Sequence, residues 1–265
     1  MVRASQTETR LCRIAWLEAG AGWPLVLLHA FPLHAEMWRP QLERVPDGWR
    51  FIAPDFPGFG GSQLAGAPAP GLGGYATAVG DLMDCLGLED AVIAGLSMGG
   101  YVTFEMFRQS PERFTGVVLA DTRPQADTAE GRDGRARMRE LLARDGPAAV
   151  ADRMLPSLLS AGADAAVKAH VRAMIEEADP AGIDAAIAGM MERPDSTPDL
   201  PRLACATLVV VGEQDAITPV ADAEAMQRAL PRSTLTIVPR AGHLSNLEQP
   251  VSFSRALADF LLAHL

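Results

Sequence analysis

Short, almost continuously apolar runs recur along the chain, and each is bounded by Gly, Pro or Asp. Six of them are rich in β-branched residues, at 24–30, 50–54, 90–95, 116–121, 207–212 and 234–239. Strands that are covered on both faces of a sheet have this continuous pattern, and such strands are usually parallel. A weaker run at 11–17 predicts an edge strand.

Amphipathic helical patterns lie between these runs. They are clearest at 75–86, 98–109, 221–229 and 251–262. Alternating strands and helices, joined by right-handed crossovers, are typical of a doubly wound α/β domain. The sequence therefore predicts a mostly parallel sheet flanked by helices.

One long segment, from about 124 to 202, breaks the alternation because it contains no convincing strand. It is Ala-rich and punctuated by prolines, with helical stretches near 134–144, 148–155, 164–178 and 183–191. An insertion here would cover the carboxyl ends of the strands, where open α/β sheets bind ligands. We therefore predict a core domain of residues 1–123 and 203–265 and a helical cap, or lid, of residues 124–202.

Composition and charge narrow the chemistry. The 265 residues are 48% apolar and 21% charged, as in ordinary globular proteins, and the net charge of −10 argues against a nucleic-acid partner. Lys168 is the single lysine, and its helical surroundings offer neither a phosphate-binding loop nor a Schiff-base site. We expect no cofactor.

The three cysteines, Cys12, Cys85 and Cys205, are far apart and set among apolar neighbours. Their spacing matches no zinc or redox motif, so we expect no metal and interpret them as buried free thiols. The chain has no secretion-signal run and no apolar stretch long enough to span a membrane. These features predict a cytoplasmic protein with no membrane contact.

The strongest motif is the G-x-S-x-G pentapeptide at 95–99. It follows a predicted strand and opens a predicted helix, the context in which such a turn exposes a nucleophilic serine. Gly95 and Gly99 suit the close packing that this turn requires, and Ser97 is the candidate nucleophile. A dinucleotide-binding fingerprint is excluded because it needs glycine where Ser97 stands.

A serine nucleophile needs a histidine base. Of the five histidines, His243 alone follows a predicted strand on the edge of the sheet that carries the serine, with a glycine beside it. The other four are less well placed: His29 and His34 lie near the first core strand, His170 is in the insert, and His264 is close to the last residue.

The histidine in turn needs a carboxylate that orients its ring. Asp215 follows the strand 207–212 and gives the chain order serine, aspartate, histidine that this architecture favours. Asp121, at the end of the preceding strand, and Glu213 are the rival candidates. We favour Asp215.

The turn after the strand 24–30 can supply one backbone donor to an oxyanion, and the residue after the serine can supply the other. These donors would be the N–H groups of Phe31 and Met98, while His29 would brace the turn. The pocket is expected to be apolar. The candidate wall residues are Trp38, Met154, Leu155, Met190 and Met191.

Taken together, five motifs resemble the α/β-hydrolase superfamily along nearly the whole chain: LLHAFP at 27–32, PDFPGFGGS at 54–62, GLSMGG at 95–100, GEQDAITP at 212–219 and AGHLSNLEQP at 241–250. The chain is most similar to the group of 3-oxoadipate enol-lactonases, cofactor-free haloperoxidases and small carboxylesterases. The resemblance implies an eight-stranded, mostly parallel sheet with a helical cap.

The same resemblance implies hydrolysis of esters or lactones through an acyl-enzyme. It maps the family's nucleophile onto Ser97, its acid onto Asp215, its base onto His243 and its oxyanion donors onto Phe31 and Met98. One departure is visible, because the family usually has His-Gly in the oxyanion turn and this chain has His29-Ala30. A glycine-like backbone angle at position 30 would distort the turn.

Several functions remain open at this point. The first is a serine carboxylesterase for small molecules. The alternatives are a lactonase, in which an arginine of the insert could bind an anionic substrate, a perhydrolase that uses hydrogen peroxide in place of water, and a catalytically silent small-molecule binder. The expected partner is a small ester or lactone, and the chain could be a monomer or a homo-oligomer.

Overall fold

The computed structural model describes residues 1–64 and 71–263. In this part of the chain, eight strands form one sheet in the order β1-β2-β4-β3-β5-β6-β7-β8. Their bounds are β1 Arg3–Glu8, β2 Arg13–Gly20, β3 Trp23–Leu28, β4 Trp49–Pro54, β5 Ala91–Leu96, β6 Phe114–Ala120, β7 Ala206–Gly212 and β8 Ser233–Val238.

All neighbouring pairs from β4 through β3, β5, β6 and β7 to β8 are parallel. Strands β2 and β4 are antiparallel, as are β1 and β2. The predicted mostly parallel sheet is therefore confirmed, and all six apolar runs are strands. The edge assignment for the run at 11–17 is wrong, because β1 covers β2 on its outer side.

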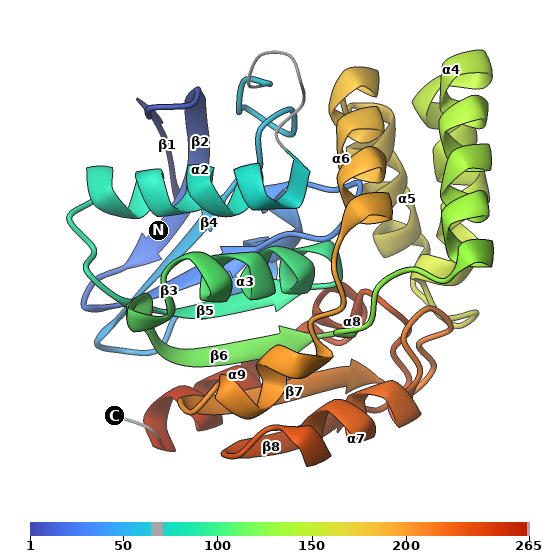
Figure 1. Ribbon diagram of the computed structural model, residues 1–265. Coiled ribbons are helices and arrows are strands. Elements are labelled where there is room, and N and C mark those ends of the chain that lie inside the picture. Colours follow the sequence, from blue (N-terminus) through green and yellow to red (C-terminus); the bar gives the residue numbers. More distant parts are fainter. Residues whose placement is uncertain (65–70, 264–265) are drawn as a thin grey trace.

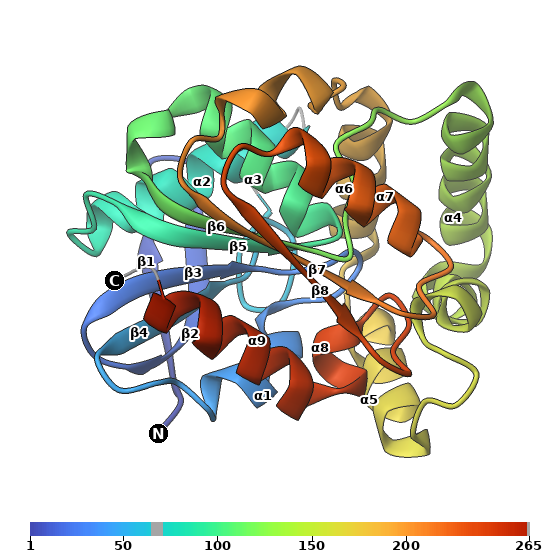
Figure 2. The same cartoon turned by 90° about the horizontal axis from the view of Figure 1, so that it is seen from below.

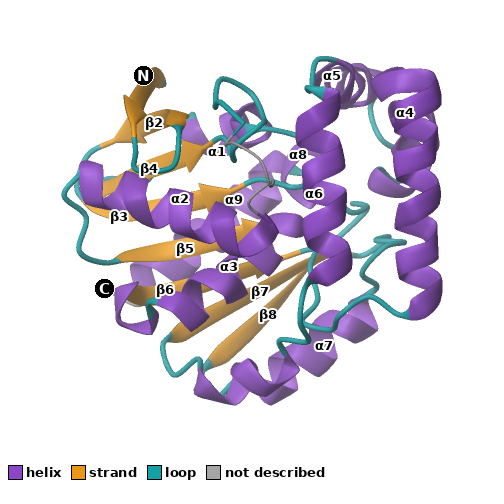
Figure 3. Cartoon of the chain, turned by 45° about the horizontal axis from the view of Figure 1, so that its top comes forward, coloured by secondary structure: helices purple, strands orange, loops and turns teal. Residues whose placement is uncertain are grey.

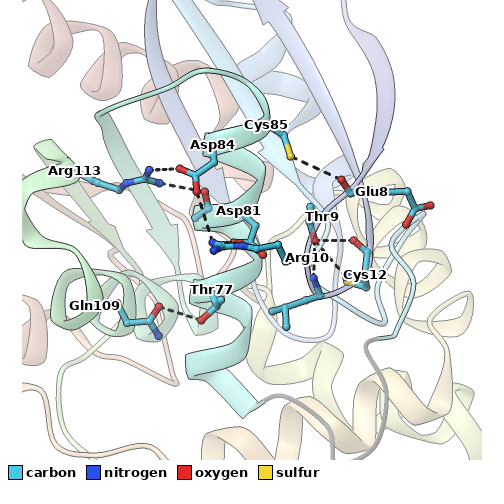
Figure 4. Close-up of polar contacts among 12 residues, drawn as sticks. Glu8, Thr9, Arg10, Cys12, Thr77, Asp81, Asp84, Cys85, Gln109 and Arg113 are labelled. Atoms are coloured by element: carbon cyan, nitrogen blue, oxygen red, sulfur yellow. Dashed lines mark hydrogen bonds and ion pairs between the residues drawn. The ribbon is translucent and has the colours of Figure 1, made fainter.

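Strand β1 has no counterpart among the predicted strands because its sequence, RASQTE, is almost entirely polar and partly exposed. Pairing with β2 supplies the hydrogen bonds that hold it. The β1–β2 turn is also held to helix α2 (Gly71–Cys85), where Arg10 Nε donates to the buried Asp81 Oδ1 at 2.8 Å. Figure 4 shows this contact beside the ion pair of Asp84 with Arg113.

Helices cover both faces of the sheet (Figures 1 and 2). One face carries α2, α3 (Met98–Gln109) and α7 (Val220–Ala229), and the other carries α1 (Arg39–Leu42) and α9 (Pro250–Ala263). Short turns complete the layers: η1 (Ala35–Trp38), η2 (Pro111–Arg113), η3 (Thr197–Arg202) and α8 (Ser245–Glu248).

Three helices between β6 and β7 form a helical insert: α4 (Ala129–Leu158), α5 (Ala165–Glu176) and α6 (Pro180–Glu192). They stand beyond the carboxyl ends of the strands (Figures 1 and 3), as the sequence predicts. Gly146, with φ 76° and ψ −175°, interrupts α4 and explains why two separate helical stretches are expected there. The division into a core and a cap domain stays a prediction.

The insert leaves and re-enters the sheet domain at one place. The Ser196 N–H donates to the Pro124 carbonyl at 2.8 Å, which joins the two connecting segments. Arg193 ties both segments to the core, since Nη1 lies 2.8 Å from Asp127 Oδ1 and the guanidinium lies 4.1 Å from the Tyr101 ring centre on α3. The base of the insert is therefore closed and anchored.

Two further expectations concern the surface. Among the described residues, every helix is too short or too polar to cross a bilayer. The three cysteines carry free thiols, and Cys12 is buried, but Cys85 is exposed and Cys205 is half-buried. The expectation that all three are buried is wrong, because Cys85 is the last residue of α2 and its exposed thiol contacts the Glu8 carbonyl of β1 at 3.8 Å.

Candidate active site

Ser97 lies alone in the tight turn between β5 and α3. Its backbone has φ 55° and ψ −113°, a conformation that L-residues rarely adopt and that is strained. The turn brings the strand end so close to the helix that a Cβ on Gly95 would lie 2.3 Å from the Gly99 carbonyl oxygen. A Cβ on Gly99 would lie 2.2 Å from the Leu28 carbonyl oxygen. Both glycines are therefore required by space.

The turn is also held by hydrogen bonds from the neighbouring strand. The Ser97 N–H donates to the Ala120 carbonyl at 2.9 Å, and the Thr122 hydroxyl donates to the Ser97 carbonyl at 2.8 Å. Rigid neighbours of this kind keep a strained residue in its conformation. The Ser97 side chain is consequently presented in one orientation, and the residue is partly accessible to solvent.

His243 lies between Ser97 and Asp215. Its Nε2 is 2.8 Å from Ser97 Oγ, and its Nδ1 is 2.8 Å from Asp215 Oδ2. The imidazole is only 1% exposed. The three residues, which come from the ends of β5, β7 and β8, are therefore joined by one continuous chain of hydrogen bonds.

Asp215 accepts further hydrogen bonds within its own loop. The Ile217 and Thr218 N–H groups donate to Oδ1 at 2.8 and 3.0 Å, and the Thr218 hydroxyl donates to Oδ2 at 2.6 Å. Burial raises the pKa of the Asp215 carboxyl, but the contacts with His243 and Thr218 outweigh it, so the pKa lies below its ordinary value. The carboxylate is therefore ionised near neutral pH.

The rival acid Asp121 is fully buried nearby but has different partners. It accepts hydrogen bonds from the Gly212 N–H at 2.7 Å and from the Ser245 hydroxyl. Burial and the neighbouring charge of Asp215 raise the pKa of Asp121 well above its ordinary value. Asp121 thus joins the end of β7 to the loop that carries His243. The other rival, Glu213, accepts from the Arg240 N–H at 2.9 Å.

This arrangement determines the proton positions. With Asp215 ionised, His243 Nδ1–H donates to it, which leaves Nε2 free to accept the Ser97 hydroxyl proton. The group can therefore generate a serine nucleophile. In the described ranges, no cluster of three or more His, Cys, Asp or Glu side chains is placed to hold a metal ion.

The turn after β3 lies next to this edge of the sheet. The Phe56 N–H donates to His29 Nε2 at 3.0 Å, so the His29 proton is on Nδ1, which donates to the Ala30 carbonyl at 3.0 Å. His29 therefore braces the turn. Ala30 has a negative φ, so the turn does not require a glycine at this position. Phe31 follows it, and Met98 is the first residue of α3.

The comparisons with known proteins can be set against this geometry. Residues 25–256 match the model of the Alpha/beta hydrolase family. The match begins within β3 and includes β4 to β8, the helical insert and the three residues joined by hydrogen bonds, while β1 and β2 lie before it.

The chain belongs to the α/β-hydrolase family.

Relatives of this α/β hydrolase include 3-oxoadipate enol-lactonase 2 of Acinetobacter baylyi, which is 27% identical over 88% of this chain and 86% of the relative. The pimeloyl-[acyl-carrier protein] methyl ester esterase of Nitrosomonas europaea is 29% identical over 88% and 94%. Among solved structures, a thermophilic esterase from Thermogutta terrifontis with malate bound is 39% identical, covers 99% of both chains and superposes with a TM-score of 0.94.

The predicted wall residues of this hydrolase have different surroundings. Trp38 is fully buried, with its ring centre 5.9 Å from that of Phe253 on α9, so its visible contacts are those of a core residue. Met190 is buried, and Leu155 and Met191 are half-buried. Met154, together with other α4 residues and with Ala216 beside Asp215, lines a cavity of about 550 Å³. A wall role for each of these residues stays a prediction.

Sequence reasoning missed three residues of this site: Thr218, Ser245 and Glu248. Thr218 follows Asp215 by three residues, a spacing at which a threonine hydroxyl can donate to an aspartate carboxylate. This contact could therefore have been predicted from the sequence. Ser245 and Glu248 contact partners distant in the chain, and nothing local reveals them. Their contribution becomes visible only in the folded hydrolase.

His29 makes a testable contribution to stability. Burial lowers the pKa of its imidazole to about 3, from an unfolded value near 6.5, although its hydrogen bond to Ala30 acts in the opposite direction. Below pH 6.5 the unfolded chain therefore binds a proton that the folded chain excludes. The unfolding free energy should fall by up to about 1.4 kcal/mol per pH unit as the pH drops from about 6.5 towards 3.

His29→Gln tests this, because an amide can accept from Phe56 and donate to Ala30 but does not titrate. Urea unfolding at a series of pH values from about 7 to 5 should give a shallower decline for the variant than for the wild type. The other ionisable groups are common to both proteins and cancel in the comparison. Parallel declines would contradict the assigned pKa of His29.

Proposed function

We propose that this α/β hydrolase cleaves carboxylic esters of small molecules through an acyl-enzyme on Ser97. The hydrogen-bond chain from Ser97 Oγ through His243 to Asp215, with both distances at 2.8 Å, carries this proposal. A strained, glycine-flanked turn that presents the serine supports it independently. A silent binder would have no need for either feature.

The mechanism has two halves. Ser97 Oγ attacks the carbonyl carbon while its proton moves to His243 Nε2, and the N–H groups of Phe31 and Met98 bind the oxyanion. The bond to the alcohol then breaks, and His243 returns the proton to the leaving oxygen. Water next attacks the acyl carbon, giving its proton to His243, and the carboxylic acid leaves as Ser97 regains its proton. Asp215 stabilises the imidazolium in both halves.

The comparisons favour an open ester over other substrates. The structural relative at 39% identity is described as an esterase, and a second relative is a methyl ester esterase. Lactones are the second candidate, because two enol-lactonases of Acinetobacter baylyi are 27% and 25% identical. A lactone is a cyclic ester, so the same groups can open it. The helical insert would act as a cap that selects between these substrates.

A substrate panel tests the proposed function. Purified protein should hydrolyse p-nitrophenyl acetate and butyrate, with turnover falling as the acyl chain lengthens beyond the pocket. A few lactones and a reaction with added hydrogen peroxide, assayed in parallel, separate the lactonase and perhydrolase alternatives. A fluorophosphonate probe should label Ser97 and block turnover. Absence of both labelling and ester hydrolysis would overturn the proposal.

A further inference from the structure

The loop that carries His243 rests directly on the end of α4, in the helical insert. The Leu244 N–H donates to the Leu158 carbonyl at 3.1 Å. On the other side of the histidine, a Cβ on Gly242 would lie 2.6 Å from the Ser160 nitrogen and 2.9 Å from the Leu159 carbonyl carbon. Only glycine fits this contact, so the loop and the insert meet through their backbones.

One carboxylate joins the two sides. Glu248, at the end of α8, accepts a hydrogen bond from the Gly242 N–H at 2.7 Å through Oε1. Through Oε2 it accepts from the Ser160 N–H at 3.0 Å and from the Ser160 hydroxyl at 2.5 Å. Ser160 is 6% exposed. The loop residue just before His243 and the first residues after α4 are therefore bound to the same side chain.

The hydrogen bonds of Glu248 indicate that its carboxylate positions neighbouring groups and does not pair with a positive charge. Among the described residues, it has no Lys, Arg or His nitrogen within 4.0 Å. Its three donors are two backbone N–H groups and one hydroxyl. Hydrogen bonds to a carboxylate are short and directional, so they fix where Gly242 can lie relative to Ser160.

We propose that Glu248 is a positioning residue that ties the location of the catalytic base to the helical insert. The inference rests on the proposed function, in which His243 must keep Nε2 within hydrogen-bond reach of Ser97. Docking of the insert then completes the site, because the insert supplies the Ser160 donors that hold Glu248 in place. A displacement of about 1 Å at a catalytic group can cost about 10²-fold in rate.

Glu213 offers a matched control. Its carboxylate accepts from the Arg240 N–H at 2.9 Å, three residues before His243, so it makes the same kind of bond to the start of the same loop. That contact does not involve the insert. A variant at Glu213 therefore measures how kcat responds when the loop loses one hydrogen bond to a carboxylate while its contacts with the insert stay intact.

The experiment compares Glu248→Ala, Glu248→Gln, Ser160→Ala and Glu213→Ala. We measure kcat and KM for p-nitrophenyl acetate, and stability by urea unfolding. Glu248→Ala should lower kcat by about 10²-fold with KM nearly unchanged. Glu248→Gln should recover much of the loss, because its amide can accept from Gly242 and donate to the Ser160 hydroxyl. The kcat of Ser160→Ala should lie between those of Glu248→Ala and Glu248→Gln. The kcat of Glu213→Ala should equal that of the wild type.

Equal kcat values for Glu248→Ala and Glu213→Ala would overturn the proposal. If Glu248→Ala does not fold, Glu248→Gln and Ser160→Ala decide, and wild-type kcat in both would overturn it. If the wild type hydrolyses no ester, the proposed function fails separately, and hydrogen exchange tests the positioning role. Faster exchange at both 241–244 and 159–161 in Glu248→Gln or Ser160→Ala would support it, and a change in only one segment, or in neither, would overturn it.

Discussion

Replacing Ser97 by alanine should lower kcat for p-nitrophenyl butyrate by about 10⁶-fold, the loss expected when the nucleophile of a Ser–His–Asp enzyme is removed. The substitution removes the hydroxyl that forms the acyl-enzyme in the proposed mechanism, and His243 then has no Ser97 proton to accept. Any residual hydrolysis would come from oxyanion binding and substrate orientation alone. Stopped assays with high enzyme concentration can measure a loss of this size.

Ser110→Ala serves as the matched control for Ser97→Ala, because Ser110 follows α3 and its hydroxyl does not cap the first turn of η2. Its turnover should equal that of the wild type. Fluorophosphonate labelling should disappear in Ser97→Ala and persist in Ser110→Ala. Substantial turnover or labelling in Ser97→Ala would show that another residue is the nucleophile.

The second large effect is expected for Asp215→Asn, which should lower kcat by about 10⁴-fold. An amide at this position can donate to Nδ1 of His243, which favours the tautomer that carries its proton on Nε2. Nε2 can then no longer accept the proton of Ser97. The amide also carries no charge to stabilise the imidazolium. The overall fold should persist, because Thr218 can still donate to the remaining oxygen.

Asp121→Asn is the contrast. Asp121 touches Gly212 and Ser245 but not the His243 ring, so an amide there can keep accepting from Gly212 and can donate to the Ser245 hydroxyl. Its kcat should fall far less than that of Asp215→Asn. An equal fall in the two variants would mean that the acid function is shared, and would contradict the assignment to Asp215 alone.

The sheet was largely predictable because burial on both faces leaves a continuous apolar run. That explanation holds for β3 to β7, whereas β8 is an edge strand that is largely half-buried or exposed although its run is apolar enough to predict it. Strand β1 is polar and exists because β2 offers it a hydrogen-bonding edge. The same absence of signal makes β2 look like an edge strand. Helix α3 is predicted at 98–109 and observed at Met98–Gln109, because a glycine pair marks its start and a Ser-Pro pair follows its end.

The candidate site was predictable wherever a residue follows a strand end. Ser97, Asp215 and His243 all meet this condition, and parallel strands bring their carboxyl ends to one edge. Asp121 meets it equally well, and only the hydrogen-bond partners in the folded chain separate the two: His243 Nδ1 contacts Asp215, whereas Asp121 accepts from Gly212 and Ser245. Glu248 could not be found this way, because its partners are backbone groups whose positions depend on how the insert docks.

The closed base of the insert has an evolutionary consequence. Because the Ser196 N–H donates to the Pro124 carbonyl, the segments that lead into and out of the insert lie side by side. Segments with neighbouring ends can be exchanged without rethreading the rest of a domain. During evolution, this insert could therefore be replaced by another, with a change of substrate, while the sheet stays unchanged. If Glu248 positions the catalytic base as proposed, any such replacement must also supply hydrogen-bond donors to Glu248, as Ser160 does here.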